Sequence, residues 1–356
     1  MASLAEMDWE TFHGLDVWQK ACAFRDTDRE LHIILAQQFS RDRLDALGAL
    51  ATHIRRVAKT HAGSDFLQGT LSHKRAMLFF SQPSTRTFLS FCAACEILGL
   101  KMGEVRNPST SSEFKGESRD DSVRTFSSYF DLIIMRSEIG GLAERVAWLL
   151  SHSERPVPVI NAGSGKDQHP TQALLDVYTL QRSFEGRGGI DGKRIVFAGD
   201  LKRGRTVRSL SVLLAQYENV EQCFVAPDDL QIGDDILALL RDKEVSYSLR
   251  DDLRPELASA DAVYMTRVQD EWDASDGAAR AFDPARFRID TDALQLMKPD
   301  AAILHPLPRR DEISPDVDHD VRAVYWRQMR NGMWIRAALI ASLFGVEDQI
   351  WGYAGV

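Results

Sequence analysis

The chain carries a run of hydroxyl and guanidinium groups, Ser84-Thr85-Arg86-Thr87, directly after the apolar stretch 76–80 and at the start of a helical pattern over 85–98. Backbone N–H groups in the first turn of a helix lack intrahelical partners, and the helix dipole adds positive potential there. With the forked donors of Arg86, this arrangement is typical of a phosphate-binding site. Taken alone, the run also fits a capped helix with a surface arginine, because Ser and Thr cap helices routinely.

Other segments rich in donors and acceptors are spread along the rest of the chain. Each segment taken separately fits a structural role, since a His-Pro pair often starts a helix and an arginine after a strand is often solvated. Together with Arg86 they offer four arginines that an acidic protein could gather around anionic substrates. The segments are Lys115-Gly116-Glu117, Met135-Arg136, His169-Pro170-Thr171-Gln172, Gly204-Arg205-Thr206, Thr266-Arg267-Val268-Gln269 and His305-Pro306-Leu307-Pro308.

In this order the segments resemble the signature set of the aspartate/ornithine carbamoyltransferase family, in the variants of its aspartate-specific branch. The resemblance runs from about His32 to about Leu343 and includes the intervening stretches 161–163, 174–176 and 310–313. It implies transfer of the carbamoyl group of carbamoyl phosphate to the amino group of L-aspartate. The products would be N-carbamoyl-L-aspartate and phosphate, in the second step of de novo pyrimidine biosynthesis.

The resemblance also implies which residues bind carbamoyl phosphate. The amino group of the carbamoyl moiety is a donor and needs acceptors, which Gln172 and the backbone carbonyls of Pro306 and Leu307 would supply. The catalytic set would be Arg86, Thr87, Arg136, His169 and Lys115. The full carbamoyl-phosphate set would be Ser84, Thr85, Arg86, Thr87, Arg136, His169, Gln172, Pro306 and Leu307, with Ser111 and Lys115 from an adjacent subunit.

For the amino-acid substrate, the resemblance implies Lys115, Arg205, Arg267 and Gln269. A dicarboxylate calls for forked, permanently charged guanidinium donors at both ends, and an amino acid with a basic side chain does not. Ornithine-type relatives usually carry His-Cys-Leu-Pro where this chain has Pro306 after the histidine, and they lack the Thr-Arg-Val-Gln segment. The sequence therefore favours aspartate.

A polar loop, Asn107 to Gly116, contains Ser111 and Lys115. By itself it fits a mobile surface loop. In the family that the chain resembles, this loop reaches into the neighbouring subunit's site, which implies a homotrimer, or a multiple of trimers, with shared active sites. Such a loop would act as a lid on the substrates.

Two positions depart from the family pattern and leave alternatives open. Gln82 stands where the family usually has Glu, and Trp272 stands where it usually has Arg. In the family these two charges are linked to domain closure. One alternative is therefore a transcarbamoylase for a different acidic or amido acceptor, and another is a non-catalytic regulatory or assembly homologue.

The periodicity of the sequence predicts an α/β fold with two doubly wound parallel-sheet domains. The resemblance implies that one is a carbamoyl-phosphate domain and the other an aspartate domain, and that interdomain helices join them. At 356 residues the chain exceeds the size of one hydrophobic core. We place an N-terminal extension at 1–30, the carbamoyl-phosphate domain at 31–185 plus 326–356 and the aspartate domain at 186–325. Strands are expected over 76–80, 132–135, 157–161, 194–198, 222–226, 245–248, 262–265 and 301–304, and helices over 44–57, 85–98, 118–128, 141–151, 171–184, 206–217, 233–242 and 336–344.

Composition narrows the class of protein. A formal net charge of -9 argues against general nucleic-acid binding, which usually requires a basic surface. No apolar run approaches the roughly 20 residues that span a bilayer, and the start lacks a basic region followed by an apolar core. We therefore expect a cytoplasmic enzyme that binds no nucleic acid and no membrane. A regulatory or pathway-enzyme partner remains open, and so does the role of the N-terminal extension.

No cofactor and no metal are expected. The segments 163–166 and 199–204 resemble phosphate-binding loops, but their spacing fits neither a P-loop nor a dinucleotide fold. The four cysteines, at 22, 92, 95 and 223, include one Cys-x-x-Cys inside a helical pattern without a second pair, which favours buried thiols over zinc or disulfides.

Overall fold

The computed structural model describes residues 4–26, 29–106, 117–165, 168–267 and 284–355. Two compact units make up the chain: unit 1 contains residues 1–175 and 329–356, and unit 2 contains residues 176–328. The units therefore divide within two long helices, α8 (Pro170–Ser183) and α12 (Tyr325–Leu343). The sequence analysis placed its domain boundaries nearby, at 185/186 and 325/326, and those boundaries stay predictions.

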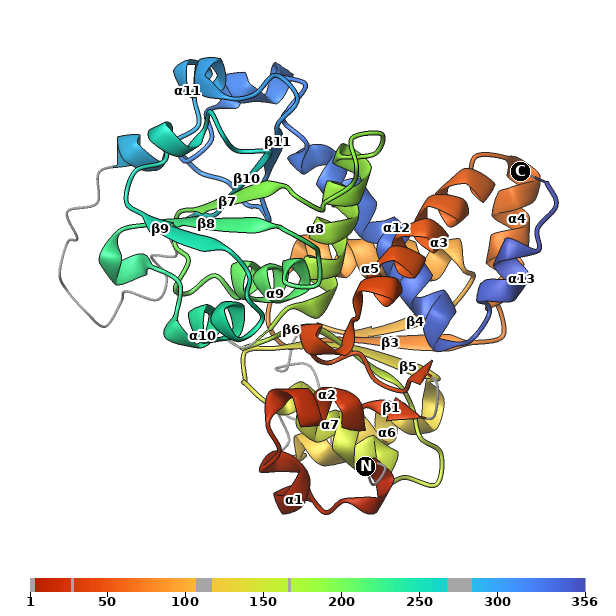
Figure 1. The fold of residues 1–356 in the computed structure, drawn as a ribbon. Helices are drawn as coiled ribbons and strands as arrows, with labels where there is room; N and C mark the ends of the chain where they lie inside the picture. Colours follow the sequence, from red (N-terminus) through yellow and green to blue (C-terminus); the bar gives the residue numbers. More distant parts are fainter. Residues whose placement is uncertain (1–3, 27–28, 107–116, 166–167, 268–283, 356) are drawn as a thin grey trace. The chain divides into compact units, whose positions relative to one another are not determined.

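Unit 1 is built on a four-stranded sheet in the order β4-β3-β5-β6, with every neighbouring pair parallel (Figure 1). The inner strands are almost continuous apolar runs because helices cover both faces of the sheet. The strands are β3 (Arg75–Phe80), β4 (Lys101–Val105), β5 (Leu132–Ser137) and β6 (Val159–Ser164).

The helices of unit 1 lie on the two faces of this sheet, with α6 and α7 on one side and α3 and α5 on the other (Figure 1). Ser40, Thr60 and Ser118 each cap a helix by accepting a hydrogen bond from a first-turn N–H group. The helices are α3 (Arg41–Val57), α4 (His61–Thr70), α5 (Thr85–Ile97), α6 (Arg119–Tyr129), α7 (Leu142–Ser151) and α13 (Glu347–Trp351).

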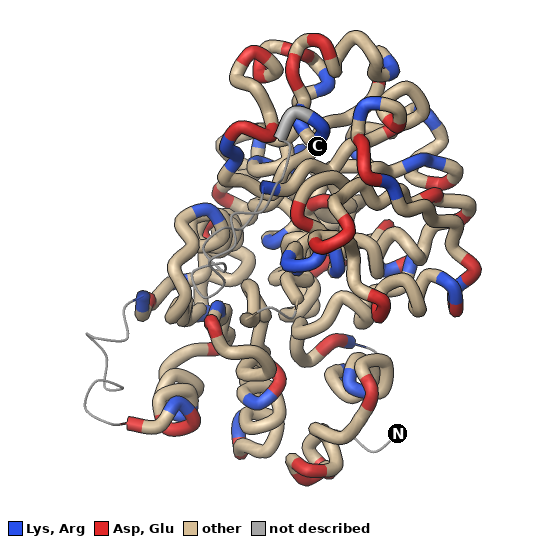
Figure 2. Tube along the Cα trace, turned by 90° about the vertical axis from the view of Figure 1, so that its left-hand side faces the viewer, with Lys and Arg blue, Asp and Glu red and all other residues tan. Residues whose placement is uncertain are grey.

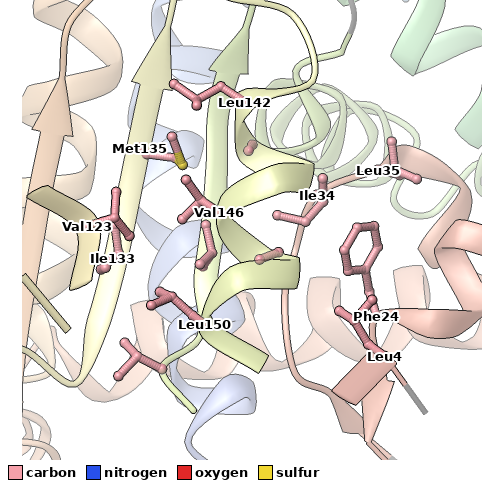
Figure 3. Close-up of a cluster of buried hydrophobic side chains, with 14 of the residues drawn as sticks. Leu4, Phe24, Ile34, Leu35, Val123, Ile133, Met135, Leu142, Val146 and Leu150 are labelled. Carbon is pink, nitrogen blue, oxygen red and sulfur yellow. The ribbon is translucent and has the colours of Figure 1, made fainter. Parts of the chain in front are cut away.

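The N-terminal segment, residues 4–26, forms two short helices, α1 (Trp9–His13) and α2 (Val17–Ala23), and the first of two short strands, β1 (Arg25–Asp26) and β2 (Arg29–Glu30). Phe12 and Phe24 are fully buried, in the same apolar cluster as Val146 of α7. Figure 3 shows Leu4 and Phe24 on one side of this cluster, with α7 and β5 side chains on the other. The segment is therefore part of the core of unit 1.

Unit 2 contains a five-stranded parallel sheet in the order β11-β10-β7-β8-β9. Alternate residues of β7 face opposite sides: Val196 joins the cluster formed with α11, and Phe197 stacks on Phe224. The elements are β7 (Arg194–Ala198), α9 (Arg205–Leu214), β8 (Glu221–Val225), α10 (Asp234–Asp242), β9 (Tyr247–Arg250), β10 (Ala262–Met265), α11 (Thr291–Leu296) and β11 (Ala302–Leu304).

The prediction of two parallel-sheet α/β domains is confirmed. Each predicted strand and helix overlaps an observed one, although α12 begins at Tyr325 where the sequence suggested 336. The sequence analysis missed the edge strand β4, the helices α4, α11 and α13, and the helices of the N-terminal segment. These elements are short or exposed, so their hydrophobic periodicity extends over too few residues to be recognised in the sequence.

Acidic and basic residues alternate along the chain of both units (Figure 2). Over the residues that the structure describes, acidic and basic side chains are therefore interspersed (Figure 2). Among the described residues, no helix combines the length and the apolar character needed to cross a membrane.

Candidate active site

The predicted phosphate ligands of unit 1 follow three adjacent strands. Ser84 to Thr87 come after β3, Arg136 ends β5, and His169 and Gln172 come after β6. Because β3, β5 and β6 are neighbours and parallel, their carboxyl ends lie along one edge of the sheet. Ligands of doubly wound sheets bind at this edge.

The first turn of α5 is open at its N-terminus. Ser84 occupies the cap position with extended backbone, yet its side chain makes no capping hydrogen bond in the described structure. The alternative of a plain capped helix is therefore not supported. Arg86 is exposed and Thr87 is buried in the same turn, so backbone N–H groups, a hydroxyl and a guanidinium share one helix end that favours an anion.

Arg136 is held at the end of β5 by the strands on either side. It is only 8% exposed, and its Nη1 donates to the carbonyl oxygen of Ala162 at 3.1 Å. On the other side it pairs with Phe80 in the register of β3, and its carbonyl oxygen accepts the N–H of Ser81 at 3.0 Å. A hydrogen bond thus joins the loop that leads into α5 to the backbone of Arg136.

His169 is oriented by the helix it precedes. Its ring is 4% exposed, and its Nδ1 accepts the N–H of Gln172 at 3.3 Å. A backbone N–H can only donate, so this geometry assigns a bare Nδ1 and places the proton of a neutral ring on Nε2. Nε2 of His169 is therefore the donor nitrogen of the ring, and an N–H donor suits a carbonyl oxygen.

In unit 2 the predicted residues also follow three adjacent strands, β7, β10 and β11. Arg205 opens α9 after β7, and Arg267 follows β10; both side chains are half-buried. The loops that carry them are joined, because Thr266 donates from N and Oγ1 to the carbonyl of Ala198, at 2.8 and 3.1 Å. Gly199 is required at this junction: its φ is +114°, and a Cβ would lie 2.1 Å from the carbonyl oxygen of Thr266.

The segment after β11 makes a tight turn around a buried histidine. His305 is fully buried; its Nδ1 accepts the N–H of Leu307 at 2.7 Å and its Nε2 lies 2.7 Å from Oε1 of Glu312. Burial would raise the pKa of the Glu312 carboxyl, but the hydrogen bond from His305 and nearby backbone N–H groups hold that pKa below its usual range. Leu307 has a φ of +56°, in the left-handed region, and precedes a cis peptide bond to Pro308.

The structure thus groups the predicted residues by unit. Unit 1 brings Ser84, Thr85, Arg86, Thr87, Arg136, His169 and Gln172 to one sheet edge, and unit 2 brings Arg205, Arg267, Pro306 and Leu307 to one sheet edge. Ser111, Lys115, Gln269 and Trp272 lie outside the described residues. The sequence analysis overlooked Glu312, which no local pattern connects to His305.

The side-chain and backbone donors at these strand ends can bind an anion and can polarise a carbonyl group. Within the described ranges, no group of three or more His, Cys, Asp or Glu side chains is placed to hold a metal ion. The four cysteines are free thiols, but the prediction that they are buried holds only for Cys95 and Cys223, since Cys22 is exposed and Cys92 is partly exposed.

Comparison with known proteins identifies the family. A sequence model described as "Aspartate/ornithine carbamoyltransferase, carbamoyl-P binding domain" matches residues 31–182, and one described as the "Asp/Orn binding domain" matches residues 191–343. The chain is 41% identical over 317 residues to aspartate carbamoyltransferase 1, chloroplastic, of Pisum sativum, covering 87% of this chain and 78% of the relative.

Two further relatives agree. The crystal structure of aspartate transcarbamoylase from Trypanosoma cruzi in complex with carbamoyl phosphate and aspartate has a TM-score of 0.77 at 38% identity, covering 87% of this chain and 96% of that one. The multifunctional protein URA2 of Saccharomyces cerevisiae is 38% identical over 321 residues, covering 90% of this chain and 14% of that protein. The chain therefore belongs to the aspartate/ornithine carbamoyltransferase family, and the prediction of a carbamoyltransferase of its aspartate-specific branch is confirmed.

Proposed function

We propose that this chain transfers the carbamoyl group of carbamoyl phosphate to the amino group of L-aspartate, giving N-carbamoyl-L-aspartate and phosphate, as the second step of de novo pyrimidine biosynthesis. The observation that carries the proposal is the open α5 terminus beside Arg136 and His169 in a chain with both family domains. A carbamoyl-phosphate and aspartate complex of a relative with the same fold supports it.

The phosphate is assigned to the α5 end of unit 1. Thr85 and Arg86 offer donors from the first turn of the helix, and Arg136 adds a forked donor set at the next strand. A dianionic phosphate satisfies several such donors at once. Burial of Arg136 strengthens the attraction, because less water screens the charge.

Carbonyl polarisation is assigned to His169 and Arg136, with Arg86 and Thr87. When the amine attacks, negative charge develops on the carbonyl oxygen, and donors already aimed at that oxygen lower the barrier. The Nε2–H of His169 is such a donor, fixed by the bond at Nδ1. The C–N bond forms and the C–O bond to phosphate breaks; phosphate leaves with the electron pair and accepts the proton that the attacking amine loses, so no protein nucleophile is needed.

The amino-acid substrate is assigned to Arg205 and Arg267 in unit 2, with Gln269 and Lys115 as further predicted ligands. The hydrogen bonds from Thr266 fix the distance between the two loops that carry these arginines. Two carboxylates held by two guanidinium groups place the amine for attack and convert the reaction into an effectively intramolecular step.

The test is a transfer assay with the purified chain. Carbamoyl phosphate is supplied with aspartate, ornithine, oxamate or another amine, and the carbamoylated product is measured. Turnover with aspartate and none with ornithine is the expected result. Activity only with another amine would show that the acceptor is not aspartate. This outcome is worth testing because Gln82 and Trp272 depart from the family pattern. Carbamoyl phosphate should also raise the melting temperature, whereas no shift and no turnover would indicate a non-catalytic homologue.

We also infer a homotrimer, or a multiple of trimers, in which Ser111 and Lys115 serve the neighbouring subunit. The exposed edge strand β4 and the exposed Leu89 and Met102 support a subunit contact on this side of unit 1, since unpaired edges are normally covered. Light scattering and complementation between Lys115→Ala and Arg136→Ala chains test it, because mixed trimers with shared sites would recover activity. The match to a segment of a multifunctional protein supports a pathway-enzyme partner.

We assign the enzyme to the cytoplasm. Its four free cysteines are typical of a reducing compartment. Cell fractionation checks this, and recovery of the chain in an organelle fraction, as the name of the pea relative implies for that protein, would contradict it.

A further inference from the structure

The segment His305 to Pro308 offers hydrogen-bond acceptors without competing donors. Pro306 and Pro308 have no backbone N–H, and the N–H of Leu307 is already bonded to Nδ1 of His305 at 2.7 Å. The carbonyl groups keep their lone pairs. An acceptor-only strip of backbone fits an NH2 group, which has two hydrogens to donate and no accessible lone pair when it is an amide.

This strip needs support, because Leu307 stands at a φ of +56°, in the left-handed region that non-glycine residues rarely adopt. The imidazole of His305 supplies that support, and its protonation pattern can be read from its partners. Leu307 N–H can only donate to Nδ1, and the Glu312 carboxylate can only accept from Nε2. Both contacts together fit one neutral tautomer, with hydrogen on Nε2 and none on Nδ1.

Glu312 is in turn held by the backbone. Both of its carboxylate oxygens accept the N–H of Arg310, at 3.0 and 3.1 Å. If Glu312 were absent, the imidazole could place its hydrogen on Nδ1, and two N–H groups would then face each other at Leu307. The carboxylate therefore selects the tautomer that holds the turn.

The other side of the turn is anchored by a buried network. The N–H of His305 donates to Oε1 of Gln328 at 2.9 Å, and Nε2 of Gln328 donates to the fully buried Asp176 at 2.6 Å. Asp176 also accepts the hydroxyl of Tyr264 at 2.8 Å. The backbone of residues 305–307 is thus fixed at two successive N–H groups, one by a side chain from α12 and one by the imidazole.

We propose that His305 and Glu312 are positioning residues that hold the Pro306–Pro308 strip in an acceptor-only state, so that it recognises the NH2 group of the carbamoyl moiety. This inference rests on the proposed function. His305 and Glu312 do not themselves touch the substrate. Through the strip, they allow the enzyme to distinguish carbamoyl phosphate from acyl phosphates that lack an NH2 group.

The test compares two ligands that differ at this group. Carbamoyl phosphate and acetyl phosphate share the phosphate and the carbonyl, but acetyl phosphate has a methyl in place of NH2. Their dissociation constants are measured by calorimetry on the intact chain, with inorganic phosphate as a third ligand. His305→Ala should weaken the binding of carbamoyl phosphate about ten-fold, since the hydrogen bonds that hold the strip are lost, and should change the binding of acetyl phosphate and of phosphate less than two-fold.

Conservative variants separate positioning from folding. His305→Asn should recover most of the loss, because the asparagine oxygen can accept the Leu307 N–H. Glu312→Ala should weaken carbamoyl phosphate about three-fold, and Glu312→Gln less, because its amide oxygen still accepts from Nε2. Asp311→Ala, at the exposed neighbouring position, is the matched control and should change nothing. In turnover, the loss should appear in KM for carbamoyl phosphate with kcat little changed.

Equal weakening of carbamoyl and acetyl phosphate, or unchanged binding in His305→Ala and Glu312→Ala, overturns the proposal. If His305→Ala does not fold, the Glu312 variants test the proposal through the same comparison of dissociation constants for carbamoyl phosphate and acetyl phosphate. A wild-type chain that binds no carbamoyl phosphate overturns the proposed function and this inference together. A wild-type chain that is active, with variants that do not discriminate, overturns this inference alone.

Discussion

Units 1 and 2 place their candidate ligand residues at the same topological position, after three adjacent parallel strands, but in different surroundings. In unit 1 the side chains of Arg136, His169 and Gln172 are all less than 9% exposed. In unit 2 Arg205 and Arg267 are half-buried, and the turn at Pro306 and Leu307 contributes backbone carbonyls. Equivalent strand ends therefore carry buried donors after β5 and β6 of unit 1, beside the exposed Thr85 and Arg86 of α5, and a mixture of half-exposed cations and backbone acceptors in unit 2.

The difference follows from the charge of the ligand that each unit is proposed to bind. A buried donor is costly unless it is paired, so buried and oriented donors suit a ligand that always brings several anionic oxygens. Half-exposed arginines keep part of their hydration when the acceptor is absent, so an empty acceptor site costs them less than it costs a buried cation. We therefore expect substitutions of the unit 1 ligands to affect all carbamoyl-phosphate chemistry, and substitutions of Arg205 and Arg267 in unit 2 to affect only the acceptor.

The largest effect is expected at Arg136. Arg136→Ala removes a buried forked donor from both the phosphate and the carbonyl oxygen, and kcat/KM should fall about 100- to 1000-fold. Arg136→Lys should recover little, because lysine lacks the fork. Steady-state kinetics measure this. Arg124→Ala, an exposed arginine on α6, should stay within two-fold. A comparable loss in that control would show that the buried position of Arg136 is unimportant.

The next prediction concerns the stability that the helices of the N-terminal segment give to unit 1. Phe12 is fully buried beside Phe24, at a ring-centroid distance of 5.4 Å. Phe12→Ala should lower the free energy of unfolding by about 3 kcal/mol, because it leaves a cavity in the core. Trp18→Ala on the exposed side of α2 should cost less than about 1 kcal/mol. Denaturant unfolding gives both values, and equal costs would mean that the segment is a loosely attached arm.

Arg205 tests the acceptor side of the comparison. Arg205→Ala should raise KM for aspartate about 10- to 100-fold, in line with the loss of a charged hydrogen-bonding partner. Carbamoyl phosphate should still raise the melting temperature of this variant as it does in the wild type. The control is Arg208→Ala, one turn further along α9, where the guanidinium pairs with Asp235. If Arg205→Ala also abolishes the thermal shift, Arg205 does not serve the amino-acid substrate alone, as we propose.

The sequence predicted most of the sheets and less of what surrounds them. The apolar runs at β3, β5 and β10 are visible because strands covered on both faces exclude polar residues. Strand β4 reads Lys-Met-Gly-Glu-Val and lies at the sheet edge, so no run marks it. The helices α1 and α2 have only 5 and 7 residues, too few to show a period, and their burial depends on α7, more than a hundred residues away.

The candidate site shows the same limit at the level of single residues. Ligands such as Arg136 and Arg205 could be predicted because each lies in a short motif next to its strand or helix. The role of Glu312 could not, because its contact with His305 exists only after the turn folds back over seven residues. The hydrogen bond from Arg136 to Ala162 likewise joins neighbouring strands whose pairing the sequence does not state.

The smallest predicted effect is the dependence of the free energy of unfolding on pH, which differs between the two units. His32 in unit 1 is fully buried; Val159 N–H donates to its Nδ1 at 3.1 Å and its Nε2 lies 2.9 Å from the Ser151 hydroxyl. Burial lowers the pKa of His32 to about 3. In unit 2 the groups whose pKa is lowered are carboxylates such as Glu312 and Asp318, held by hydrogen bonds from His305 and Arg309 against the opposing effect of burial.

These shifts act in different pH ranges. Below a pH of about 6.5 the unfolded chain protonates His32 and the folded chain does not, so stability is full above that pH and falls as the pH drops. Between pH 6.5 and 5 the loss should be about 2 kcal/mol. The lowered carboxylates contribute stability above their unfolded pKa, and that stability is lost only at lower pH. His32→Asn keeps an acceptor for Val159 without titrating, so urea unfolding across this range should lose the His32 part of the slope. An unchanged slope would show that His32 takes up its proton in the folded chain.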